Sequence, residues 1–289
     1  MKQRRAILGP ALVGIGLLFA GGGTASLAAD SVGFRVPECA VVDEVTGYVY
    51  VSNINGPAES WWSDDGNGFI SRLKPNGTLD RLRWRSSTKQ APLHSPKGMC
   101  ILGRTLYVAD NTRVVSYSLT SARSGVILVP GARQLNDMAT DGRDIYVTDA
   151  SVSRIWRLDR SGRGAHRVIQ APPAVNGITF AGGKMYAVSW DQHDLYEVDP
   201  SGKQAPKPFG IGKPFKALDG IEGLADGSFI VSDFNGNQVC LIPKSRQGVK
   251  KLASVVSPAD IGINRKTRRL FVPLFMKNAV EVYTLPSEE

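Results

Sequence analysis

The sequence contains few of the residues that form cross-links or metal clusters, with three cysteines and three histidines in 289 residues. Three cysteines cannot all pair, and the spacings of Cys39, Cys100 and Cys240 match no zinc pattern. Each lies in an apolar or strand-like stretch, where a thiol commonly serves as a small core residue. We therefore expect buried free thiols, with one disulfide as the alternative in an oxidising compartment.

The chain also lacks a block of positive charge, although its formal net charge is +9. Lys2, Arg4 and Arg5 supply three of these charges, and the remaining +6 is spread along the chain. Binding to nucleic acid usually requires a concentrated basic patch, so we expect no nucleic-acid partner.

The start of the chain has the pattern of a secretory signal. Its positive charges are followed by a nearly unbroken apolar run over 6–20 and by small residues at Ser26 and Ala28. This pattern predicts a signal peptide over 1–28, a single domain over 29–289, and a periplasmic or secreted location. The run is short for a spanning helix, so we expect no stable membrane span after leader removal; an uncleaved anchor is the alternative.

A repeat organises the chain after residue 36, and no later segment shows a helical apolar period. Six short segments share one pattern of aromatic and aliphatic residues, and their last residues are 57, 39, 40, 44 and 41 positions apart. These segments are Tyr48–Asn53, Leu106–Asp110, Ile145–Asp149, Met185–Ser189, Phe229–Asp233 and Leu270–Leu274.

A second column of mostly polar residues precedes the six segments at steps of 59, 39, 40, 43 and 41. A period near forty with several strand-like runs per unit is typical of propeller blades, so we predict an all-β, six-bladed β-propeller. A pair of stacked β-sandwiches is the alternative, and it would leave the period unexplained. The second column consists of Glu38, Lys97, Asn136, Asn176, Asp219 and Asp260.

Two of the six units are irregular. The last unit contains only three strand-like runs, and we predict that Val32–Val36 supplies its outer strand and closes the ring. The first unit has a long loop, Ile54–Gly68, which should overhang the channel mouth. Trp61 and Trp62 in this loop are expected to form a lid over a metal bound there; packing against a neighbouring blade or forming a partner surface is the alternative.

The polar column should lie where the innermost strands begin, so that six distant positions meet around one axis. Its members are mainly carboxylate and amide oxygens, which suit one hard divalent cation. Ca²⁺ is the first candidate, and Mg²⁺, Mn²⁺ or Zn²⁺ are further candidates. Such a cation would offset the repulsion among converging carboxylates, whose pKa values would otherwise rise.

Four short motifs within this column resemble those of the SMP-30/gluconolactonase family. The resemblance covers about residues 37 to 286 and implies a six-bladed propeller that hydrolyses sugar lactones with a divalent metal. The motifs are Pro37-Glu38, Leu135-Asn136-Asp137, Val175-Asn176-Gly177 and Leu218-Asp219-Gly220.

The resemblance also implies individual roles. Glu38, Asn176 and Asp219 would be the metal ligands, Asp219 would double as catalytic general base, and Asn136 would contact substrate or metal-bound water. Members of the family that act on sugars often have an arginine at the position of Gln134, where it would hold a polar substrate, and this chain departs from that pattern.

Other residues are predicted from their position in the repeat. Gln134 and Lys97 are expected to contact substrate together with the two tryptophans, and Asp260 is a further channel candidate. His94 is either a second acid–base group or a loop histidine without a task. Arg133 should face away from the channel because side chains alternate along a strand.

Each of these interpretations has a structural alternative. Asn176-Gly177 and Asp219-Gly220 are common turn dipeptides, and Glu38 could be a solvated strand start. Three repeated aspartates are better explained as structural groups that tie the second strands to loop backbone. They are Asp110, Asp149 and Asp233.

The sequence therefore predicts an exported, monomeric, metal-dependent hydrolase that opens a small-molecule lactone or related ester by attack of activated water. The alternative is a non-catalytic propeller, similar to NHL-type repeats, that binds a protein or glycan through the same face. A lyase acting in a comparable propeller is a third reading.

Overall fold

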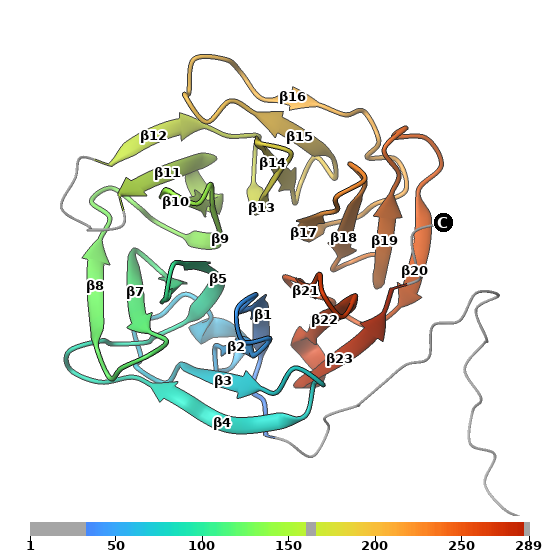
Figure 1. Ribbon diagram of the computed structural model, residues 1–289. Helices are drawn as coiled ribbons and strands as arrows, with labels where there is room; N and C mark the ends of the chain where they lie inside the picture. The colour runs from blue at the N-terminus through green and yellow to red at the C-terminus, as the bar shows by residue number, and fades with distance from the viewer. Residues whose placement is uncertain (1–32, 160–165, 286–289) are drawn as a thin grey trace, which may run out of the picture.

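The computed structural model describes residues 33–159 and 166–285, and the regular secondary structure of this part of the chain is almost entirely β-strand. Six antiparallel sheets surround a central axis like the blades of a wheel (Figure 1). The prediction of a six-bladed β-propeller is confirmed, and the alternative of two sandwiches is wrong. The predicted leader lies outside the described residues, and within those residues no helix is long and apolar enough to cross a membrane.

Among the described residues, each of the first five blades has four strands, and the sixth has three. The first three blades contain β1 (Pro37–Val42), β2 (Val49–Asn53), β3 (Phe69–Leu73), β4 (Leu79–Ser86), β5 (Pro96–Leu102), β6 (Thr105–Asp110), β7 (Arg113–Ser118), β8 (Ser124–Leu128), β9 (Leu135–Thr140), β10 (Asp144–Asp149), β11 (Arg154–Asp159) and β12 (Arg167–Gln170). The last three contain β13 (Val175–Ala181), β14 (Lys184–Ser189), β15 (Leu195–Val198), β16 (Lys207–Pro208), β17 (Leu218–Gly223), β18 (Phe229–Asp233), β19 (Gln238–Ile242), β20 (Lys250–Ser254), β21 (Gly262–Asn264), β22 (Arg269–Leu274) and β23 (Ala279–Thr284).

Both columns of the repeat occupy the predicted places. The six aromatic segments form the second strands, and the first strand of every blade lines the axis. Five members of the polar column are the second residue of an inner strand, whereas Asp260 precedes β21 by two residues. Asn176-Gly177 and Asp219-Gly220 lie within β13 and β17, so their interpretation as turns is wrong.

The polar column residues lie at a repeated irregularity of the strand ladder. In each of the first five blades, three steps along the inner strand oppose two steps along the second strand. This extra residue is a β-bulge, which redirects side chains and leaves a backbone N–H without a ladder partner. Hydroxyl groups of the second strands accept from the freed N–H groups in three blades. The pairs are Cys39 N to Ser52 Oγ at 2.9 Å, Asp137 N to Thr148 Oγ1 at 2.8 Å and Gly220 N to Ser232 Oγ at 2.7 Å.

Glycine follows the polar residue in three blades because adjacent inner strands approach closely there. A Cβ atom on Gly177 would lie 2.2 Å from the carbonyl oxygen of Asp219, and one on Gly98 would lie 2.3 Å from Cα of Asp137. A Cβ atom on Gly220 would lie 2.7 Å from Cα of Asp260. These glycines permit the close contact between neighbouring blades at the axis.

The hydrophobic core is divided among the contacts between neighbouring blades. Six apolar clusters each join the facing sides of two adjacent sheets. Cys39, Cys100 and Cys240 are buried in three of them and are unpaired, so the prediction of free thiols is confirmed.

The ring closes differently from the prediction. Residues 33–36 form no strand, and the last sheet has three strands among the described residues. Phe34, which is 1% exposed, instead inserts between the first and last blades, and the Val36 N–H donates to Asn278 Oδ1 at 2.7 Å. Main-chain hydrogen bonds between β1 and the segment before β21 close the ring: Asp260 N donates to Glu38 O at 2.8 Å, and Ala40 N donates to Asp260 O at 3.2 Å.

The glycine contact leads to a stability prediction. Gly177→Ala should lower the free energy of unfolding by about 3 kcal/mol, because the added methyl group would overlap the backbone of β17. Gly183→Ala is the control: Gly183 has a φ of +75° and open space around it, so only backbone strain of about 1 kcal/mol is expected. Urea unfolding of both variants measures the difference, and equal losses would contradict the close-packing explanation.

Candidate active site

A pocket of about 430 Å³ lies at the channel mouth, at the end where the inner strands begin. All eight side chains predicted for the site line this one pocket. They are Glu38, Asn136, Asn176, Asp219, Lys97, Gln134, Trp61 and Trp62. Asp260, the further channel candidate, does not line this pocket; its side chain lines a second pocket farther along the channel.

The floor of the pocket is polar and almost closed to solvent. Glu38, Asn176 and Asp219 are 5%, 6% and 6% exposed. Glu38 Oε2 and Asn176 Oδ1 have no hydrogen-bond partner among the residues that the structure describes. Buried oxygens of this kind normally have a partner, so the unmatched pair indicates a place for a ligand.

The carboxyl groups of the floor favour their neutral forms. Burial, followed by the charge of Asp219, raises the pKa of Glu38 well above its ordinary value. Burial, followed by the charge of Asp137, raises the pKa of Asp219 to about 8. Raised pKa values in a cleft are typical of groups whose charge is balanced only when a ligand binds.

Lys97 is the positive side chain of the pocket. It is 3% exposed, and burial lowers its pKa to about 8. Its Nζ donates to the carbonyl oxygens of Trp61 at 2.6 Å and Ser95 at 3.3 Å, and it lies 3.9 Å from the centre of the Trp62 ring. The ammonium group therefore holds the tryptophan loop onto the inner strand of blade 2.

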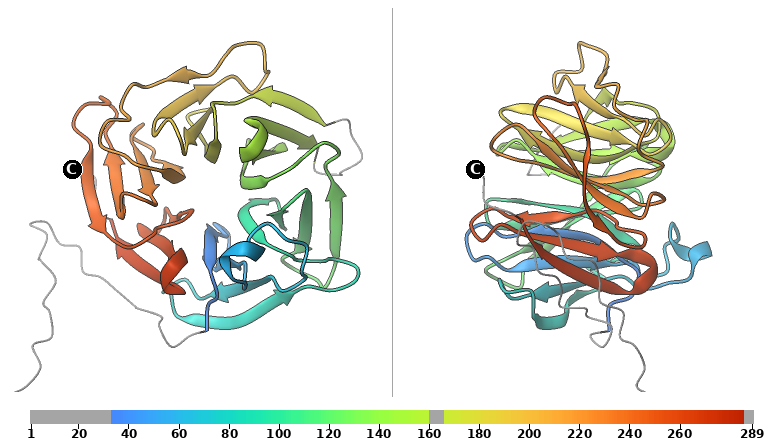
Figure 2. Two further views of the ribbon diagram at one scale, coloured as in Figure 1. Left: turned by 180° about the vertical axis from the view of Figure 1, so that it is seen from behind. Right: turned by 90° about the vertical axis from the view of Figure 1, so that its right-hand side faces the viewer.

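The long loop of blade 1 stands out from one face of the propeller (Figure 2). It contains a 3₁₀ turn, η1 (Ala58–Ser60), and is tied mainly to blade 2. Ser95 Oγ donates to the carbonyl of Ser60 at 3.2 Å, and Asn111 Nδ2 donates to that of Ser63 at 3.0 Å. Both predicted positions of the tryptophans occur together: each lines the pocket, and Trp61 also packs edge-on against Phe275 of blade 6 at 4.7 Å.

A third repeated position, which was not predicted to belong to the site, forms the wall of the pocket. The residue directly after each second strand lines the pocket in five of the six blades. Four of these residues donate their backbone N–H to the segment before an inner strand: Ile54 to Val36 O, Ala150 to Gln134 O, Trp190 to Ala174 O and Phe234 to Ala217 O, at 2.8–3.1 Å. The five wall residues are Ile54, Ala150, Trp190, Phe234 and Phe275. The sequence could have shown these residues, because each comes directly after one of the six repeated segments.

The three repeated aspartates are structural, as predicted. Each accepts backbone N–H groups from the segment that leads into an inner strand. Asp149 accepts from Arg133 and Gln134, both at 2.9 Å. Asp110 accepts backbone N–H groups from the segment before Lys97, and Asp233 accepts them from the segment before Asp219. These carboxylates therefore fix the entry of the chain into the site without lining the pocket.

His94 contacts the long loop and does not line the pocket. Its Nδ1 accepts from Gly66 N at 3.0 Å, and its Nε2 lies 3.0 Å from a guanidinium nitrogen of Arg113. The interpretation as a loop histidine therefore fits, and that of a second acid–base group does not. Arg133 is exposed and faces away from the pocket, as strand alternation predicts.

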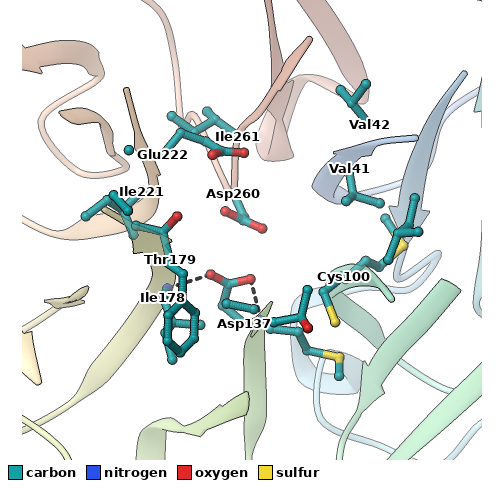
Figure 3. A pocket seen from close by; sticks show the side chains of 18 of the residues that line it. Val41, Val42, Cys100, Asp137, Ile178, Thr179, Ile221, Glu222, Asp260 and Ile261 are labelled. Carbon is teal, nitrogen blue, oxygen red and sulfur yellow. Dashed lines mark hydrogen bonds between the residues drawn. The ribbon is translucent and has the colours of Figure 1, made fainter. Parts of the chain in front are cut away.

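A second pocket of about 480 Å³ occupies the other half of the channel. Asp137 and Asp260 face one another across it and interact through their carboxyl groups (Figure 3). Asp137 accepts from Met138 N at 2.6 Å and from Ile178 N at 2.7 Å. Burial nevertheless raises the pKa of Asp137 to about 7 and that of Asp260 well above its ordinary value.

Over the described ranges, no group of three or more His, Cys, Asp or Glu side chains is placed to hold a metal ion. The oxygen set of the channel mouth is of another kind, because it combines two carboxyl groups with the amide of Asn176.

The fold and the pocket define a class: six-bladed propellers with a site where the blades converge. A scan against protein-family models and a search of curated proteins found no match. Solved structures resemble the chain over nearly its whole length, at identities that establish the fold alone.

Three of these structures illustrate the class. Virginiamycin B lyase from Staphylococcus aureus is 13% identical, with a TM-score of 0.59 over 91% of this chain and 100% of that one. Luciferin-regenerating enzyme is 15% identical, with a TM-score of 0.63 over 91% and 96%. A structural-genomics target with the provisional name gluconolactonase is 16% identical, with a TM-score of 0.64 over 92% and 93%.

The contact between Lys97 and the long loop can be tested by proteolysis. Lys97→Met should raise the rate of cleavage within 54–68 about tenfold, because it removes charge-assisted hydrogen bonds that hold the loop closed. Lys184→Met is the matched control, since Lys184 is exposed and pairs with Glu197 far from the pocket. Limited digestion followed by mass spectrometry would identify the cleaved bonds, and equal cleavage in both variants would refute the anchoring role.

The acid pair of the second pocket predicts a pH dependence of stability. The folded pKa of Asp137 lies near 7, above the 3.8 of an unperturbed aspartate. The unfolded chain therefore releases its proton first, so this pair's contribution to stability is complete below about pH 4 and is lost as the pH rises through 7.

Asp260→Asn should make this loss smaller by more than about 1 kcal/mol between pH 5 and pH 8, because the Asp260 carboxyl, whose pKa is raised by burial, no longer titrates. The measurement is urea unfolding at several pH values. Asp226→Asn is the control, because the pKa of Asp226 is lowered and it titrates below this range. If the free energy of unfolding falls as steeply with pH in Asp260→Asn as in the parent protein, the acid pair is not the cause of the pH dependence.

Proposed function

We propose that this protein is a metal-dependent hydrolase that opens a lactone or a related small ester at the channel mouth. The observation that carries the proposal is the pair of buried, unpartnered oxygens on Glu38 and Asn176 beside the carboxyl of Asp219. Three oxygen donors from three blades share a pocket that a loop covers from one side. Export of the chain and a monomeric state belong to the same proposal.

The donor set suits one hard divalent cation, with Ca²⁺ as the first candidate. Glu38, Asn176 and Asp219 would hold it, and the raised pKa values of both carboxyls express the repulsion and burial that a cation would offset. When bound, a divalent cation would polarise an ester carbonyl and lower the pKa of water.

Side chains of the protein would carry out proton transfer, substrate orientation and the exclusion of water. Asp219, once ionised, would accept a proton from the attacking water as the tetrahedral oxyanion forms. Asn136 and Gln134 line the same pocket and would orient the substrate by hydrogen bonds. The loop that carries Trp61 would reduce the access of bulk water, which strengthens each electrostatic contact inside.

The structural neighbours support an enzymatic role. The structurally similar proteins include a lyase, a luciferin-regenerating enzyme and a target provisionally named gluconolactonase. The second candidate is a non-catalytic propeller that binds a protein or glycan through this face; the half-exposed Trp62, at 38%, is the observation in its favour.

Asp219→Asn should lower lactone hydrolysis at least about 10³-fold while leaving the fold intact, because an amide cannot accept the proton. Circular dichroism checks the fold, and a pH-drop assay over a lactone panel with Ca²⁺, Mg²⁺, Mn²⁺ and Zn²⁺ measures turnover. Asp226→Asn is the control, since that carboxyl lies outside the pocket.

Cation binding can be measured without turnover. Saturating divalent cation should raise the melting temperature of the parent protein, because it binds the folded state alone. Glu38→Gln and Asn176→Ala should remove most of this shift, whereas Asp226→Asn should retain it. No shift with any cation, together with no lactone opened, would reject the hydrolase and favour the binding module.

A further inference from the structure

The wall above the polar floor divides into an aromatic side and a small polar side. Four aromatic rings from blades 1, 6, 5 and 4 follow one another in contact. Trp61 meets Phe275 at 4.7 Å, Phe275 meets Phe234 at 5.5 Å, and Phe234 meets Trp190 at 5.4 Å. These centroid distances are those of packed edge-on or tilted pairs, so the rings form one continuous arc.

The other side of the pocket belongs to blade 3 and presents Gln134, Ala150 and Ser151. Apart from indole N–H groups on the aromatic side, the polar side-chain groups of the described wall lie on this side. The oxygens and the ammonium of the pocket lie below, on the inner strands.

The arc is held in a fixed position by the backbone. Trp190 N donates to Ala174 O at 2.9 Å, Phe234 N to Ala217 O at 2.8 Å and Phe275 N to Ser257 O at 3.0 Å. The Trp61 indole Nε1 donates to Gly56 O at 3.2 Å, so its polar edge is satisfied and its apolar surface remains for contact. A rigid apolar wall above a polar floor is typical of sites that orient an amphipathic small molecule.

A sugar ring would fit this wall poorly. A sugar lactone carries hydroxyls on most of its carbons, and burial of a hydroxyl without a donor or acceptor beside it is unfavourable. Among the described residues of the wall, Gln134 and Ser151 offer side-chain acceptors, whereas the aromatic side offers only indole N–H donors, of which that of Trp61 is already bonded to Gly56 O.

We infer that the substrate is a lactone or ester that carries a flat apolar group, such as a phenyl ring, which lies against the arc of Trp61, Phe275, Phe234 and Trp190. The carbonyl of the same molecule reaches the floor between Glu38, Asn176 and Asp219. This inference rests on the proposed function for the reacting group, whereas the apolar part of the ligand follows from the wall alone.

The test compares three six-membered lactones: δ-valerolactone, δ-phenyl-δ-valerolactone and D-glucono-δ-lactone. After division by each lactone's rate with hydroxide, kcat/KM should be at least about tenfold higher for the phenyl compound than for the sugar compound. A preference for the sugar lactone would overturn the inference and leave the hydrolase proposal standing.

Variants locate the preference in the wall. Trp190→Leu and Phe234→Leu should reduce the phenyl-to-unsubstituted ratio of kcat/KM about tenfold. Phe209→Leu is the matched control, because Phe209 packs against Tyr186 and Phe229 and does not line the pocket. An unchanged ratio in both wall variants would overturn the inference.

Binding without chemistry separates the two proposals. Isothermal titration calorimetry uses δ-phenyl-δ-valerolactam and D-glucono-δ-lactam, which resist ring opening. The parent protein should bind the phenyl compound more tightly than the sugar compound, and Trp190→Leu should lose this difference in affinity. If this holds while no lactone is opened, the hydrolase proposal fails and the ligand class stands. If neither lactam binds and no lactone is opened, both are overturned.

Discussion

The close approach of the inner strands around the axis is the constraint on which the rest of the structure depends. Without a Cβ atom, Gly98, Gly177 and Gly220 let neighbouring backbones come within contact distance. The bulge at the same register directs the preceding side chain toward the channel mouth. Polar residues that are dozens of positions apart are thereby forced into one small space with little water.

This crowding explains the electrostatics of the channel. Burial comes first among the causes that raise the pKa values of Glu38, Asp219, Asp137 and Asp260. Lys97 provides only partial compensation, because its ammonium is directed to carbonyl oxygens of Trp61 and Ser95. The floor therefore retains buried oxygens without partners, which is the feature that most distinguishes the site from an ordinary packed core.

Much of the fold could be predicted because one unit is used six times. Its two columns placed the second strands and the beginnings of the inner strands correctly. The predicted closing strand was wrong, since a strand needs a neighbouring backbone to pair with. Here Phe34 enters the core between two blades, and Asn278 and Ile54 take the hydrogen bonds of Val36. Asp260 lies in the channel, but the sequence did not reveal that it belongs to the second pocket, where its backbone pairs with β1 and its carboxyl faces Asp137.

The sequence by itself determined the number of blades and the polar residues that converge, because both follow from spacing along the chain. Only the tertiary structure decided what surrounds those residues. Whether Trp190, Phe234 and Phe275 form one continuous wall depends on contacts between blades, and these depend on side-chain packing across the ring. Spacing determines which positions meet; the packing of neighbouring blades determines what a ligand at that meeting point would touch.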